Sequence, residues 1–241
     1  MEQPIEYNNQ DAIDFFSQLP ENFIVFEEQV DVQSQLEYFE SSKKCREEKQ
    51  KTEISENIKF LFQPNVTIEV KKDILVNLAS QENIESFRII EKYKNNPDPG
   101  MKDWAALAFI ESKTLIENSL TDESYVIISS GLGGKGSCLR FFVVLFCSNE
   151  IGFSETHQKI VKTETEIKFS EYTAEIEEVD FNDIYCSVTC LIPVKTPAHL
   201  MFRSIIDECN EYGNFLKTNF IVTNIKKLTW EEIFQLKEEN K

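Results

Sequence analysis

Histidine is scarce in this sequence, and its scarcity excludes most acid–base catalytic sites. Only two of the 241 residues are histidine, the side chain that most often acts as a general acid or base near neutral pH. Neither His157 nor His199 stands in a nucleophile or zinc motif such as G-x-S-x-G or H-E-x-x-H. We therefore assign no catalytic residue, and an enzyme is less favoured than either an interaction module or a ligand-binding protein.

Long apolar runs and runs of positive charge are also absent. The longest apolar stretch, LRFFVVLFC at 139–147, is shorter than the roughly 18 residues that a membrane span needs. The N-terminus lacks the basic and apolar segments of a secretory signal. No Lys or Arg run exceeds two residues, and a formal net charge of −17 repels a phosphate backbone. We expect a cytoplasmic protein that binds neither membrane nor nucleic acid. Its acidic charge is explained either by solubility or by a basic protein partner.

The cysteines are expected to be free thiols, because no export signal accompanies them. Cys186, Cys190, His199 and Cys209 have a spacing that resembles a zinc ligand set. However, IYCSVTCLIPV at 184–194 alternates with the period of a strand, where residues four apart are separated by about 13 Å. Two sulfurs each about 2.3 Å from one zinc cannot lie that far apart. The three thiols are predicted to be core residues, and neither a metal nor a cofactor is expected.

The chain is long enough for two domains and apolar enough to fold, with 41% hydrophobic residues and 19 phenylalanines. Its composition changes near SLTDES at 119–124. We therefore predict an α+β protein with a helical domain over 1–120 and a sheet domain over 121–241.

Residues 11–119 are predicted to be almost wholly helical from their apolar periodicity. The first helix, DAIDFFSQL at 11–19, would close before a proline. Further along, Asp98 is expected to cap a helix whose first residue is Pro99, because a proline at that position supplies no amide proton and needs no partner.

Residues 71–119 resemble a HEAT-like helical repeat. A helix ending in LA, a short polar turn, a helix carrying Phe87 and Ile90, and a DP pair before WAALA together carry the resemblance. It implies a right-handed stack of helices whose exposed face docks a protein. Because about three repeats are usually needed to bury such faces, the upstream helices and the second domain are expected to cover the ends.

The second half is predicted to contain a mostly antiparallel, ferredoxin-like sheet, with an extra strand, SYVIIS at 124–129, before it. Residues 155–172 fit a strand by the alternation in VKTETEIKF and fit a helix by a capping Ser154 and their length. We favour the helix, because it gives the chain order of a ferredoxin-like unit. A helix from Pro197, capped by Thr196, follows.

Glycine is used only seven times, yet four glycines crowd into SSGLGGKGSC at 129–138. The spacing fits neither a P-loop nor a dinucleotide fingerprint, because the next segment reads as a strand rather than a helix. A hairpin loop is the favoured interpretation. The alternative is an anion-binding loop, with the following candidate residues: Gly131, Gly133, Gly134, Lys135, Gly136 and Arg140.

A run of acidic residues follows this stretch and is predicted to be a solvated face rather than a set of paired carboxylates. It consists of Glu164, Glu166, Glu171, Glu175, Glu177, Glu178 and Asp180. The favoured function is a protein-interaction or adaptor module. The alternative is a regulatory binder of a small anionic ligand held by the loop at 131–136.

Overall fold

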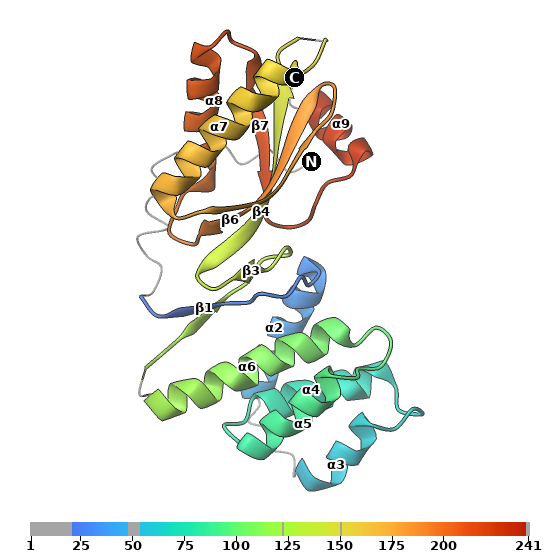
Figure 1. Ribbon diagram of the computed structural model, residues 1–241. Helices are drawn as coiled ribbons and strands as arrows, with labels where there is room; N and C mark the ends of the chain where they lie inside the picture. Colours follow the sequence, from blue (N-terminus) through green and yellow to red (C-terminus); the bar gives the residue numbers. More distant parts are fainter. Residues whose placement is uncertain (1–20, 48–53, 122, 150, 240–241) are drawn as a thin grey trace. The chain divides into compact units, whose positions relative to one another are not determined.

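The computed structural model of the protein divides the chain into two units, 22–131 and 132–241, each with its own core (Figure 1). The structure describes residues 21–47, 54–121, 123–149 and 151–239. The helix predicted at 11–19 lies outside the described residues. The chain is of mixed α+β type, with helices in both units and an antiparallel sheet in the second.

The first unit consists of helices and one small pair of strands. Its elements are β1 (Phe23–Val25), α2 (Val32–Glu47), α3 (Ile54–Leu61), α4 (Ile68–Ala79), α5 (Ile84–Lys94), α6 (Lys102–Thr121) and β2 (Val126–Ile128). The regularly spaced apolar residues that predicted the helices also form the core between them. Leu75, Ile90 and Leu107, one from each of α4, α5 and α6, are fully buried.

The two strands of this unit correct the prediction of an almost wholly helical segment. β1 pairs in parallel with β2, with Ile24 opposite Ile127. SYVIIS therefore does not extend the sheet of the second unit. On the other side of β2, the Asn118 side-chain amide accepts from the Tyr125 N–H at 2.9 Å and donates to the Tyr125 carbonyl at 3.3 Å. A strand of three residues has too little periodicity to be seen, and its partner lies far away in the sequence.

The predicted cap at Asp98 is also wrong. Helix α6 begins at Lys102, and Gly100 adopts a φ of +80° in the turn before it. The Asp98 carboxylate instead accepts a hydrogen bond from the Tyr93 hydroxyl at 2.7 Å and pairs with the buried Lys71 ammonium. The hydrogen bond from Lys71 lowers the pKa of Asp98. A buried lysine needs a carboxylate partner more than an exposed helix end needs a cap.

A second buried polar cluster joins α2 to α6. The Glu111 carboxylate accepts from the Tyr38 hydroxyl and the Ser42 hydroxyl, both at 2.5 Å, and lies 3.3 Å from the Arg46 guanidinium. Only 4% of Glu111 is exposed. Each carboxylate oxygen therefore has a donor, which is what allows a charge to be buried here.

We predict that Glu111→Ala destabilises the helical unit by about 3 kcal/mol, because the Tyr38 and Ser42 hydroxyls lose their buried acceptor and Arg46 keeps only its bond to Ser42 Oγ. Urea denaturation followed by hydrogen exchange of the α2 and α6 peptides measures this loss. Glu117→Ala, on the exposed side of the same helix, is the control and is expected to change stability by less than about 0.5 kcal/mol. Equal effects of the two changes would contradict the prediction.

Within its described residues, the second unit contains an antiparallel sheet and three helices. Its elements are β3 (Gly134–Lys135), β4 (Cys138–Cys147), α7 (Glu155–Tyr172), β5 (Glu175–Phe181), β6 (Tyr185–Pro193), α8 (Ala198–Glu211), β7 (Leu216–Thr223) and α9 (Trp230–Glu239). The long strands lie in the order β5-β6-β4-β7, and β3 forms a hairpin on β4. Helices α7 and α8 cover one face of the sheet and α9 lies on the other (Figure 1).

The segment at 155–172 is helical, as predicted. Ser154 Oγ accepts from the His157 N–H at 3.2 Å, and the His157 ring stacks on Phe215 with 4.3 Å between centroids. Val161 and Phe169 point into the core with Thr165 between them. This spacing of four residues sets the buried side of the helix, and the alternation that favoured a strand is incidental.

Three cysteines of the sheet unit are core residues, as predicted. Cys186, Cys190 and Cys209 are fully buried, and burial raises the pKa of each thiol, that of Cys209 to about 12. All six cysteines are free. No group of three or more possible metal ligands occurs among the described residues.

The start of α8 differs by one residue from the prediction. Pro197 occupies the capping position and the helix begins at Ala198, so the Thr196 side chain is not the cap. Pro197 has a ψ of 94°, which is outside the helical range. The proline fixes its own φ but leaves its ψ free, so it marks the helix start only to within a residue.

Gly152 marks a close approach between two backbone segments of this unit. Its φ is +91°, and a Cβ added there would lie 1.7 Å from the Asp183 carbonyl oxygen. The neighbouring Phe153 N–H donates to that same oxygen at 3.0 Å. The loop before α7 and the loop between β5 and β6 therefore meet backbone to backbone. An added methyl group would press on backbone atoms and not on a side chain that could move away.

We predict that Gly152→Ala costs at least ~2 kcal/mol, since the methyl group forces the two loops apart. Gly136→Ala is the matched control, because Gly136 also has a positive φ but nothing within 4 Å of an added Cβ. The control should cost about 1 kcal/mol from backbone strain alone. Urea midpoints from hydrogen exchange of β4 and β6 peptides distinguish the two, and equal losses would refute the contact.

Candidate functional site

The glycine-rich stretch is the tight hairpin between β3 and β4. Lys135 pairs with Cys138, so Gly136 and Ser137 form a two-residue turn. Gly136 has a φ of +60° and Ser137 is not in the left-handed region. A positive φ at only the first central residue is the pattern of a type II′ turn, which favours glycine there.

The other glycines let the chain enter the hairpin through the interior. Gly131, Gly133 and Gly134 are buried. The Gly133 carbonyl accepts from the Arg140 N–H at 2.9 Å, and the Leu132 N–H donates to the Asn224 carbonyl at 2.9 Å. These two bonds join the stretch to β4 on one side and to the residue after β7 on the other. The glycines are therefore explained by the backbone structure, without a ligand.

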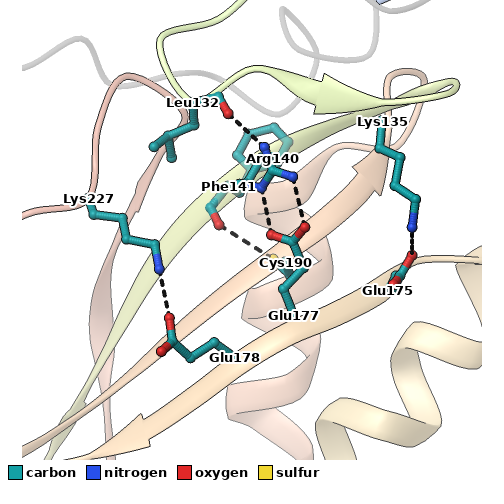
Figure 2. A network of polar contacts seen from close by, with 9 residues as sticks. All are labelled: Leu132, Lys135, Arg140, Phe141, Glu175, Glu177, Glu178, Cys190 and Lys227. Carbon is teal, nitrogen blue, oxygen red and sulfur yellow. Dashed lines mark hydrogen bonds and ion pairs between the residues drawn. The ribbon is translucent and has the colours of Figure 1, made fainter. Parts of the chain in front are cut away.

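Arg140 is the centre of a polar network on the face of the sheet opposite α7 and α8 (Figure 2). Its Nε and Nη2 donate to the two carboxylate oxygens of Glu177 at 2.6 and 2.8 Å, and Nη1 donates to the Leu132 carbonyl at 2.9 Å. Bidentate pairing of this kind is the strongest form of carboxylate recognition by arginine. It lowers the pKa of Glu177.

Two further ion pairs flank this one in Figure 2. Lys135 Nζ lies 3.3 Å from Glu175 Oε2, and Lys227 Nζ lies 2.6 Å from Glu178 Oε2. The hydrogen bond from Lys227 lowers the pKa of Glu178. We refer to the acidic residues of β5 as the β5 carboxylate row, which consists of Glu175, Glu177, Glu178 and Asp180.

A bulge in β5 creates this row. The register with β6 shifts between Ile176 and Glu178, so Glu177 is the extra residue. Glu177 and Glu178 are consecutive, yet both bond to cations on the same face, to Arg140 and Lys227. A regular strand would send them to opposite faces. The bulge thereby lets three carboxylates of one strand meet three cations from β3, β4 and the segment before α9.

The structure brings together only some of the residues that the sequence suggested for an anion-binding loop. Lys135 and Arg140 both face β5, as Figure 2 shows, but each already has a carboxylate partner. An anion at the loop would have to compete with Glu175 and Glu177 for these cations. The acidic residues of β5 are not a merely solvated face, since three of them are ion-paired. Sequence reasoning missed Lys227 altogether, because it lies far along the chain.

Comparisons with known proteins place the chain in no family. No family model and no curated protein matches it. One solved structure to which the chain is weakly similar is a REP-associated tyrosine transposase bound to a REP hairpin, with a TM-score of 0.33 and 12% identity over 40% of this chain. The likeness spans 61% of that protein's chain. At that TM-score it supports no statement about fold or function. Within the described residues, no helix is long and apolar enough to cross a membrane.

We predict that Glu177→Gln costs about 1 kcal/mol at pH 7, because the Arg140 side chain loses its charged partner in a site that is mostly shielded from water. The folded-state pKa of Glu177 is depressed, so its contribution is complete above its ordinary value of 4.5 and is lost as the pH falls through the folded pKa. Urea midpoints of both proteins should therefore converge below pH 4.5.

The control is Glu175→Gln, which removes an exposed pair with Lys135 whose side chains are 62% and 59% accessible. It should change stability by less than about 0.5 kcal/mol at any pH. A difference between Glu177→Gln and the wild type that does not vary with pH would show that the carboxylate charge is unimportant.

Proposed function

We propose that this protein is a cytoplasmic protein-interaction module that binds a basic partner through the acidic surface of its sheet unit. Acidic residues outnumber basic ones in both units, which supports a positively charged partner. Six free thiols support a reducing compartment.

The observation that carries the proposal is the position of the β5 carboxylate row. β5 is the last strand at one end of the sheet order, and the side chains of Glu175, Glu178 and Asp180 are exposed. The Lys135–Glu175 and Lys227–Glu178 pairs are accessible, and exposed pairs of this kind contribute at most about 1 kcal/mol. A partner's Lys or Arg can therefore replace these internal cations at little cost.

The finer features of the fold are part of the same proposal. We take α4, α5 and α6 to form a short HEAT-like stack, supported by their mutual packing in one core. We take the sheet unit to be ferredoxin-like, supported by the chain order β4-α7-β5-β6-α8-β7 and the strand order β5-β6-β4-β7.

The competing proposal is a small anionic ligand held by the loop at 131–136. It requires Lys135 and Arg140 to release Glu175 and Glu177 before they can bind the anion. Because the Arg140–Glu177 pair is bidentate and only 17% and 27% of the two side chains are exposed, that exchange is costly. The protein partner is the better supported of the two.

The test measures binding of fluorescently labelled peptides of about 15 residues with basic, neutral or acidic composition. We expect the basic peptides to bind, and their affinity to fall as NaCl rises from about 50 to about 300 mM. A triple variant, Glu175→Gln with Glu178→Gln and Asp180→Asn, should weaken this binding at least about tenfold, which is about 1.4 kcal/mol.

The matched control removes the same number of charges from exposed positions on the helical unit, by Glu40→Gln, Glu82→Gln and Glu91→Gln. It should retain binding. If both triple variants lose affinity equally, the net charge and not β5 attracts the peptides. If no basic peptide binds the wild type, the proposed function is wrong.

A further inference from the structure

On its outer side, β5 has no strand partner within the part of the chain that the structure describes. Among the described residues β6 is the only strand that β5 pairs with, and β5 ends the strand order of the sheet. The outward backbone N–H and C=O groups of such a strand are a template for one more strand. At seven residues β5 is longer than the very short edge strands by which proteins avoid pairing.

The part of β5 beyond the bulge has the regular geometry that pairing needs. Glu178, Val179, Asp180 and Phe181 pair in unbroken register with β6. Their side chains alternate between the two faces. Glu178 and Asp180 belong to the face of the carboxylate row, whereas Val179 and Phe181 pack at the margin of the core under α7 and α8. Lys162 of α7 lies over the Phe181 ring at 5.5 Å.

We infer that the outer edge of β5 accepts an extended segment of a partner protein in which basic and apolar residues alternate, an inference that rests on the proposed function. Residues directly opposite each other on paired strands lie about 4.5–5.5 Å apart. The basic side chains of the segment therefore lie beside Glu178 and Asp180, and its apolar side chains extend the surface formed by Val179 and Phe181.

Charge selects this occupant over a second copy of the chain. Two β5 edges paired with each other would set carboxylates against carboxylates, and like charges opposite one another are destabilising. By contrast, Asp180 forms no ion pair with Lys or Arg within the described part of the chain, and the Lys227–Glu178 pair is about half exposed. β7, at the other end of the order, contains Lys217 and no acidic residue, so it offers no such selection.

The probe is an acetylated heptapeptide of alternating lysine and valine, titrated into the whole protein while backbone NMR shifts and hydrogen exchange are recorded. We expect slowed exchange of β5 amides in 178–181. A peptide with the same residues in two blocks should bind at least about tenfold more weakly. Two further peptides carry N-methyl groups, one on all lysines and one on all valines. Because the N–H groups of alternate residues point to the same edge of a strand, each peptide is blocked along one edge, and only one of the two should lose binding.

Asp180→Lys should lower affinity at least about tenfold, and Asp180→Asn should do so by a smaller factor while keeping the shape of the side chain. Thermal melts verify that both variants fold. If all lysine peptides bind alike and the β5 amides exchange as before, the edge inference is wrong while the proposed function stands. If no lysine heptapeptide binds while basic peptides of about 15 residues do, the edge inference alone is wrong, and if neither binds, both are wrong. If the protein dimerises through protected β5 amides without peptide, a second copy is the occupant and the inference is overturned.

Discussion

The bidentate pair between Arg140 and Glu177 is the constraint on which the polar face of the sheet depends. It links β4 to β5 across the intervening strand β6, and the third donor of the same guanidinium fixes the Leu132 carbonyl at the entry to the glycine hairpin. One side chain thereby holds the bulged strand and the hairpin in a single arrangement. A lysine at this position could not replace it, because a single ammonium cannot match both carboxylate oxygens and the carbonyl in that geometry.

The bulge explains why the site could be predicted only in part. Ile176, Val179 and Phe181 all pack towards α7 and α8, although their spacing of three and then two residues breaks strand alternation. Only an extra residue between them brings all three to the same face. That irregular spacing is visible in the sequence and is the one local signal for the site. The partners Arg140 and Lys227 are set by long-range pairing, which no local pattern encodes.

The same contrast between local and distant information applies to the fold. The helices around Leu75, Ile90 and Phe169 follow from apolar spacing within one segment, and the buried cysteines of β6 follow from alternation within one strand. The pairing of β1 with β2 and the use of Asp98 by Lys71 join residues far apart in the chain. The start of α6 was predicted wrongly, because Asp98, the expected capping residue, pairs instead with Lys71, which lies 27 residues earlier in the chain.

The acidic residues of β5 meet two physical requirements at once. An exposed strand edge tends to aggregate, and carboxylates on it discourage pairing between copies. Under the proposed function, the same carboxylates complement the charges of a basic strand. The internal cations pair with three of the four carboxylates. The pairs at Glu175 and Glu178 are weak and accessible, while the shielded Arg140–Glu177 pair keeps the bulge in place. The Arg140–Glu177 pair thus stabilises the strand, whereas the pairs of Glu175 and Glu178 are the ones that can exchange their cations.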